Sequence, residues 1–307
     1  MDYKTKKIKN QELQKIIINK VSSEMFQRIE YCGSFLEFHS DFTGEVKKLV
    51  KANNCENRFC PICAYKKARK EALKLSVLIK SLEKDNNFLF LTLTSPNVTS
   101  DNLEEEIKLY NESFKRLTKL KPFMSAVVGY VRKLEVTYNH DLKTYHPHFH
   151  VLLAVKKSYF SSRNYIKRDE WLEMWKSAKR DNTITQVDVR KLDLSLDDKG
   201  ILEIAKYSAK DSDYLKSQDI FDVIYKALKG KRLITYNGVF KESVKEFKKG
   251  NLDNYIEIDM TEYIYRILYQ WGRGDYVERE KRELTQDEKE RFNYKQIEEL
   301  NMFRTEE

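Results

Sequence analysis

The chain has 307 residues, of which 34% are charged and 41% are hydrophobic, and its Lys and Arg residues outnumber its Asp and Glu residues by 57 to 48. This length allows one large domain or two to three small ones with a real core, and the net charge of +9 is compatible with a nucleic-acid partner without identifying one. No apolar run approaches the roughly 20 residues of a membrane span, and no hydrophobic segment follows the lysine-rich residues 1–10, which excludes membrane-spanning classes and predicts a cytoplasmic protein.

All four cysteines lie within the first 63 residues. Cys60 and Cys63 have the two-residue spacing with which two thiolates reach one tetrahedral zinc ion, and Cys55 and Cys32 would complete the shell. In a reducing compartment such a cluster favours a metal over disulfides, although a redox pair is the alternative. His39 is the substitute ligand if Cys32 is not the fourth. The sequence therefore predicts a closed, structural Zn²⁺ site.

A helix is expected on each side of this cluster. Residues 11–30 carry apolar side chains at near-helical spacing, and from Ala68 to Leu82 apolar residues recur at intervals of 4, 3, 4 and 3 positions, which indicates one face of a long helix. The opposite face of the second helix is basic. Such a face is usually only solvated, but beside a zinc module it is a candidate for gripping DNA phosphates through Lys66, Lys67, Arg69 and Lys70.

The next elements are a strand and a helix. Residues 88–94 alternate leucines with Phe and Thr and are followed by a turn at residues 95–97, which predicts a strand. Asp101 and Glu104 have the spacing of a capping box at the start of an amphipathic helix, and Pro122 is expected to mark the end of that helix.

Two long strands then form a hairpin. Residues 126–138 read as one strand, residues 139–141 as the turn, and residues 145–155 as the returning strand. The order of strand, helix, strand and hairpin is typical of an α+β fold in which flanking helices lie against a central antiparallel β-sheet.

Four of the five histidines lie between positions 140 and 150. In the returning strand, His148 and His150 project from one face because strand side chains alternate with period two, so their imidazoles can meet at one metal ion. A strand histidine is usually just a core or surface residue, and this stretch alone leaves both interpretations open. Glu135 on the preceding strand would complete a three-ligand site; its alternative is a surface pair with Lys133 or Arg132.

This donor set of one carboxylate and two imidazoles leaves coordination positions open for water and a phosphate oxygen. It suits Mg²⁺ or Mn²⁺, and Zn²⁺ would also bind it.

A helix predicted over residues 198–211 carries the second informative pattern. At about 100° per residue, Glu203, Tyr207 and Lys210 lie on a single stripe. A phenol, a carboxylate and an ammonium are the nucleophile, base and phosphate clamp that covalent cleavage of a phosphodiester needs. An ordinary amphipathic helix is the competing interpretation.

The remaining elements are less informative. The sequence predicts a helix around residues 171–178 with core aromatics, a strand over 183–190, a helix from Asp219 to Gly230, a strand and turn over 231–240, a strand over 263–271, and a charged end from Arg273 with a helix capped by Thr285 and Glu288.

Three segments, in this order, resemble the motifs of rolling-circle replication initiators from small Gram-positive plasmids, which belong to the His-hydrophobic-His (HUH) endonucleases: residues 91–94, 146–153 and 203–210. The run at residues 57–63 also resembles the cysteine segment of that family. The resemblance implies an HUH fold related to the ferredoxin-like split βαβ arrangement. The expected division is a zinc module with a basic helix (residues 1–84), the endonuclease core (85–230) and a C-terminal extension (231–307).

The resemblance also implies roles for individual residues. His148 and His150, with Glu135, would hold a divalent cation. Tyr207 would attack the scissile phosphate at the origin, leaving a 5′-phosphotyrosine and a 3′-OH primer, and Glu203 would activate water at termination.

Three further residues are assigned on the same basis. Lys210 would steady the phosphate, while Lys206 would contact DNA and help the phenol to ionise. Tyr214 is a rival nucleophile if the helix continues.

The implied partners are origin DNA, with the nick site extruded as a hairpin, and the host helicase, single-strand-binding protein and DNA polymerase; a dimer stays open. Relaxases of the same superfamily carry their tyrosine before the histidines, and its transposases are generally shorter and lack a cysteine cluster, so replication is favoured over mobilisation or transposition. A non-catalytic, zinc-containing nucleic-acid-binding protein is the alternative from another class.

Overall fold

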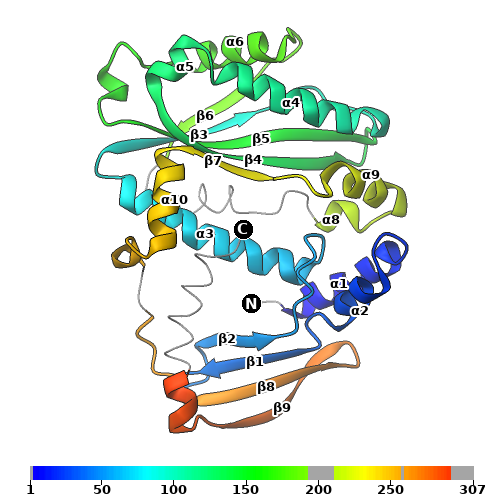
Figure 1. Cartoon of the computed structure of the whole chain (residues 1–307). Helices are drawn as coiled ribbons and strands as arrows, with labels where there is room; N and C mark the ends of the chain where they lie inside the picture. Colours follow the sequence, from blue (N-terminus) through cyan, green and yellow to red (C-terminus); the bar gives the residue numbers. More distant parts are fainter. Residues whose placement is uncertain (1–2, 193–210, 257–258, 292–307) are drawn as a thin grey trace. The chain divides into compact units, whose positions relative to one another are not determined.

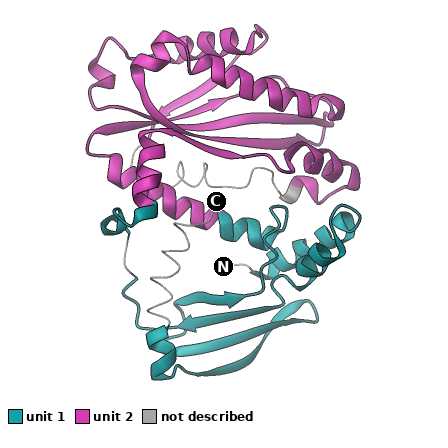
Figure 2. Ribbon diagram, viewed as in Figure 1, with its two compact units in different colours: residues 1–67, 248–307 teal, residues 68–247 magenta. Residues whose placement is uncertain are grey.

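The computed structural model describes residues 3–192, 211–256 and 259–291 (Figure 1). The chain divides into two compact units (Figure 2): residues 1–67 with 248–307 form unit 1, and residues 68–247 form unit 2. No described helix is both long and apolar enough to cross a membrane.

Unit 1 combines two helices with a four-stranded antiparallel sheet in the order β2-β1-β8-β9. Its elements are α1 (Tyr3–Ile17), α2 (Ser23–Tyr31), β1 (Phe35–Ser40), β2 (Lys47–Ala52), the 3₁₀ turn η3 (Asp253–Tyr255), β8 (Tyr265–Gly272) and β9 (Asp275–Glu283).

The sheet of unit 1 pairs strands from the N-terminal part of the chain with strands from its C-terminal part. β1 pairs with β2 on one side and with β8 on the other, where Phe38 faces Ile267. The β1–β2 turn is held by Asp41, whose carboxylate accepts from Val46 N at 3.1 Å and from Thr43 Oγ1 at 2.6 Å. Asp fits this position because its short side chain can bond to nearby backbone N–H groups.

Unit 2 contains a five-stranded antiparallel sheet in the order β6-β3-β5-β4-β7. Its strands are β3 (Asn86–Leu93), β4 (Val127–Asn139), β5 (Thr144–Lys156), β6 (Val187–Lys191) and β7 (Ile234–Gly238). Its helices are the C-terminal part of α3 (Pro61–Leu82), then α4 (Leu103–Leu117), α5 (Lys121–Ala126), α6 (Arg168–Lys179), α8 (Asp211–Tyr214), α9 (Gln218–Leu228) and most of α10 (Val239–Lys249), with 3₁₀ turns η1 (Ser100–Asn102) and η2 (Tyr159–Ser161).

One face of the unit 2 sheet is covered by α4, α5 and α6 (Figure 1). The ring of Phe149 on β5 packs edge-on against Tyr110 and Phe114 of α4, with ring centroids 5.3 and 5.6 Å apart. Trp171 and Trp175 of α6 are fully buried, as expected for core aromatics. Because side chains alternate along β5, the histidines flanking Phe149 face away from these helices.

Two glycines let β4 and β7 approach closely. Gly129 pairs with Gly238, and a Cβ on Gly238 would lie 2.1 Å from Val128 O. Gly238 also has φ +56°, a region that L side chains rarely adopt. These positions fix where β7 ends and α10 begins.

The predicted fold class is confirmed: the chain is α+β, its sheets are antiparallel with flanking helices, and the cysteine cluster lies near the N-terminus. The division into segments 1–84, 85–230 and 231–307 stays a prediction.

Several element predictions were wrong. Residues 11–30 are not one helix but parts of α1 and α2, separated around Ser22, whose hydroxyl caps α2. The expected capping box at Asp101 is absent, because this residue lies inside the 3₁₀ turn η1 and no side chain caps α4. Pro122 begins α5 instead of ending α4, since the first turn of a helix tolerates proline.

The charged end of the chain contains the unpredicted strand β9. The capping box that follows it is present: Thr285 Oγ1 accepts from Glu288 N at 3.2 Å, and Glu288 Oε2 accepts from Thr285 N at 3.0 Å. Residues 286–291 are helical.

Candidate metal centres

The β4–β5 hairpin brings Glu135, His148 and His150 together. In its register Glu135 lies opposite His148, and Lys133 lies opposite His150, so all four side chains share one face of the sheet. His148 Nε2 and His150 Nε2 are 3.1 Å apart, and Glu135 Oε2 lies 3.2 Å from His150 Nε2 and 3.8 Å from His148 Nε2. Adjacent ligands of an octahedral ion bound at 2.1 Å are about 3 Å apart, so these separations fit a divalent cation.

A hydrogen bond fixes the tautomer of His148, and His150 has a hydroxyl beside its Nδ1. His148 Nδ1 is 3.2 Å from the carbonyl oxygen of His146, which can only accept, so Nδ1 carries the proton and the Nε2 lone pair faces the group. His150 Nδ1 is 3.4 Å from Thr92 Oγ1 on β3. Glu135 Oε2 is buried and has no hydrogen bond of acceptable geometry among the described residues. One carboxylate oxygen and two imidazole nitrogens that converge in this way are what a cation would bind.

The electrostatics of the group favour metal binding near neutral pH. Burial lowers the pKa of His148 to about 4 although the charge of Glu135 opposes this shift, so its imidazole is neutral at pH 7. Burial raises the pKa of Glu135, but nearby His150 and the charge of Lys133 outweigh it, and the net shift is downward. A neutral imidazole and an ionised carboxylate are the ligand forms that bind metals.

The pKa of His148 predicts a pH-dependent loss of stability in Mg²⁺- and Mn²⁺-free buffer. Between pH 6.5 and 4 the unfolded protein takes up a proton at His148 that the folded protein does not, so the free energy of unfolding decreases as pH falls. From pH 7 to pH 5 the wild type should lose about 2 kcal/mol more than His148→Gln. Urea unfolding followed through buried Trp171 and Trp175, in a Trp271→Phe background, measures the difference; equal losses would contradict it.

The structure adds residues that the sequence did not assign to this group. Lys133 is fully buried opposite His150, and its spacing of two from Glu135 was the available signal. His146, half-buried, stacks on His148 with ring centroids 5.0 Å apart. Thr92 on β3 pairs with His150 on β5, which places it beside the group as well.

The helix predicted over residues 198–211 falls almost wholly outside the described residues. Glu203, Lys206, Tyr207 and Lys210 lie outside the described residues. The rival nucleophile Tyr214 is described: it is 3% exposed and its ring packs against Phe221, with centroids 6.0 Å apart. A buried phenol so placed is a poor nucleophile for a DNA strand.

The four cysteines meet in unit 1. Cys32 follows α2, Cys55 follows β2, and Cys60 and Cys63 lie at the start of α3; all four are buried and unoxidised. Sγ–Sγ distances are 3.5 Å for Cys32–Cys63 and 3.6 Å for both Cys55–Cys63 and Cys32–Cys60. Thiolates at 2.3 Å around a tetrahedral zinc ion are about 3.8 Å apart, so the cluster fits that geometry.

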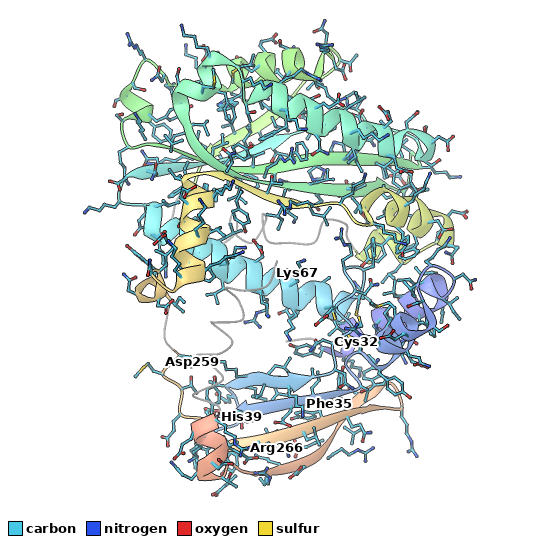
Figure 3. All side chains as sticks on the ribbon, in the orientation of Figure 1. Cys32, Phe35, His39, Lys67, Asp259 and Arg266 are labelled. Carbon is cyan, nitrogen blue, oxygen red and sulfur yellow. The ribbon has the colours of Figure 1, made fainter. Side chains whose placement is uncertain are left out.

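The substitute ligand His39 is not a member of this cluster. It is buried in β1 in register with Lys48 and Arg266, and Figure 3 shows it toward the opposite end of β1 from Cys32. The four sulfurs therefore make up the donor set by themselves.

The basic face of α3 is solvated, as its composition predicts. Lys66, Lys67 and Arg69 are exposed and Lys70 is half-buried. Its role in DNA binding stays a prediction.

Comparison with known proteins places these features in context. The family model described as "Replication protein" matches residues 46–279. The chain is 50% identical over 216 residues to "Protein rep" of Staphylococcus aureus, an alignment that covers 69% of this chain and 94% of that protein. It is 35% identical over 252 residues to "Protein rep" of Bacillus amyloliquefaciens, covering 74% of each, and 34% identical over 238 residues to "Protein rep" of Streptococcus pneumoniae serotype 2, covering 75% and 74%. No solved structure matches the chain.

Proposed function

Because the chain belongs to the replication protein family, we propose that it initiates rolling-circle replication of a plasmid by nicking one strand of the origin DNA. The observation that carries this proposal is the buried group of Glu135, His148 and His150, whose acceptor atoms all lie within 4.8 Å of one another. A metal held there would have the carboxylate and imidazole ligands that leave positions open for a phosphate oxygen, which supports nicking over DNA binding alone.

The proposed reaction is a transfer of a phosphodiester to a tyrosine. Mg²⁺ or Mn²⁺ held by the group would draw charge from the non-bridging oxygens of the scissile phosphate. The phenolate oxygen of Tyr207 forms a bond to phosphorus while the bond to the 3′ oxygen breaks, so the strand ends in a 3′-OH and the enzyme carries a 5′-phosphotyrosine. A phenol with a pKa of about 10 needs a nearby cation to ionise at neutral pH, and Lys206 or Lys210 would supply it.

The position of the chain after the catalytic segment supports this assignment. Asp213 Oδ2 accepts a hydrogen bond from Tyr138 N at 3.2 Å, which fixes α8 beside β4 only three residues from Glu135. Tyr207 precedes Asp213 by six residues, and six residues span at most about 20 Å. The tether therefore allows the phenol to reach the metal group.

Glu203 is proposed to activate the water that ends the cycle by hydrolysis, so Glu203→Ala should nick normally but release its covalent product at least about 100-fold more slowly. The measurement is a pulse–chase of the protein–DNA adduct on an origin oligonucleotide. Glu203→Gln, which keeps the shape without the base, should behave like Glu203→Ala; unchanged release in both variants would remove Glu203 from the mechanism.

The cysteine cluster would hold a structural Zn²⁺, and the exposed basic face of α3, with Lys206, would contact the phosphates of the origin. The host helicase, single-strand-binding protein and DNA polymerase would act on the primed strand. The test of the whole proposal is incubation with a supercoiled plasmid that carries the cognate origin. An open circle with covalently attached protein is the expected product, and an intact supercoil with bound protein would favour a non-catalytic zinc-containing DNA-binding protein.

A further inference from the structure

We propose that α1 provides an outer shell for the four-cysteine centre, in which the ammonium of Lys7 offsets the charge of the thiolates and the amide of Asn10 orients Cys60. This inference rests on the structural zinc site proposed above and adds two residues to it. It makes metal retention and the docking of α1 one coupled event.

Lys7 is a buried cation without a carboxylate partner. It is 3% exposed, and its Nζ donates to Cys32 O at 2.7 Å, to Glu30 O at 2.9 Å and to Asn10 Oδ1 at 3.3 Å. Among the described residues it makes no ion pair with an Asp or Glu side chain. A charge taken out of water at this depth is costly unless an opposite charge is close.

The opposite charge is on the sulfurs. Lys7 Nζ donates to Cys32 O, and its other partner Asn10 donates to Cys60 Sγ, so the ammonium lies beside the cysteine cluster. Four thiolates around Zn²⁺ leave a net charge of −2 in a buried site, which an adjacent ammonium partly neutralises. The cation and the centre therefore stabilise each other.

Asn10 connects the ammonium to the metal ligands. Its Nδ2 donates to Cys60 Sγ at 3.4 Å and to Ile29 O at 3.1 Å, while its Oδ1 accepts from Lys7 and from Gln14 Nε2 at 3.0 Å. Both the oxygen and the nitrogen of the amide therefore have hydrogen-bond partners, and the nitrogen faces the sulfur of Cys60. Hydrogen bonds of this kind hold a ligand in position and typically change metal affinity 10- to 100-fold when removed.

The spacing of the buried residues in α1 places Lys7 and Asn10 on one face of the helix. The residues buried along the helix are Lys7, Asn10, Leu13 and Ile17, at spacings of three and four, so they form one stripe. Two polar residues occupy the end of the stripe nearest the sulfurs, and two apolar residues continue it. An ordinary amphipathic helix would place lysine on the opposite side.

The test compares zinc binding in full-length variants. Lys7→Met keeps the length of the side chain without the charge, Lys7→Gln keeps an N–H donor without the charge, and Lys7→Arg keeps the charge. Lys15→Met is the matched control, because Lys15 lies exposed on the same helix. Zinc content is measured by metal analysis, and zinc transfer to pyridylazoresorcinol is followed as the pH is lowered.

We expect Lys7→Met and Lys7→Gln to bind zinc about 10-fold or more weakly and to lose it at a higher pH than the wild type, with Lys7→Arg close to the wild type and Lys15→Met unchanged. If Lys7→Met lowers thermal stability but leaves the pH of zinc loss unchanged, Lys7 has only a packing role and the inference is wrong. If Lys7→Gln retains zinc as the wild type does, the charge is irrelevant and the inference is likewise wrong. A wild type purified without zinc would instead overturn the zinc site itself.

Discussion

Replacing Tyr207 by phenylalanine is expected to abolish the covalent protein–DNA adduct, with a loss of origin cleavage greater than about 10³-fold, while origin binding persists. The variant lacks only the oxygen that bonds to phosphorus, and the remaining ring can still occupy its place. The measurement is denaturing electrophoresis of the protein after incubation with a labelled origin oligonucleotide, beside a binding assay on the same DNA.

Tyr214→Phe is the matched control for this experiment. Tyr214 is buried against Phe221 in the described structure, so its replacement should leave adduct formation within a few-fold of the wild type. If Tyr207→Phe still forms the adduct and Tyr214→Phe does not, the nucleophile is Tyr214. In that case α8 would have to unpack to expose its phenol.

Replacing His150 by alanine should remove the divalent cation from unit 2 and reduce nicking by more than about 10³-fold, because one of three ligands is lost and the carboxylate of Glu135 is left buried beside a single imidazole. The cysteine-held zinc should remain, since that cluster is built from other residues. Mn²⁺ titration and metal analysis separate the two sites, and His148→Ala should behave in the same way.

His140→Ala serves as the control for the histidine variants, because His140 is exposed at the hairpin turn and makes a hydrogen bond with Lys216 Nζ at 3.2 Å. It should bind Mn²⁺ and nick as the wild type does. If His150→Ala also nicks normally, the group in unit 2 is structural and the proposed nickase mechanism fails.

The group in unit 2 could be anticipated from the sequence because its geometry is local. Period two places His148 and His150 on one face, and a tight hairpin of fixed register brings Glu135 opposite His148. Phe149, between the histidines, packs into the core beneath α4 and so holds both imidazoles on the other face.

The sheet of unit 1 could not be anticipated in the same way. β1 pairs with β8, so that Phe38 lies opposite Ile267, a residue more than two hundred positions later in the chain. No local sequence pattern encodes such a pairing. β9 is highly charged and mostly exposed, so its composition suggested solvent instead of a strand. The burial of Lys7 beside the cysteines could not be predicted either, because a lysine in a helix is expected at the surface.

The discontinuity of unit 1 has a consequence for biosynthesis. At about 5–20 residues per second, a ribosome finishes β9 roughly 12–46 s after β2 has been made, and meanwhile β1 exposes an unpaired edge prone to aggregation. The last of the four cysteines, Cys63, is translated only eleven residues after β2 ends, so zinc capture by the nascent chain would hold its first 63 residues in place for most of that interval. A prematurely terminated polypeptide ending before Tyr265 would still contain every strand of the unit 2 sheet, yet would lack β8 and β9, which are half of the unit 1 sheet.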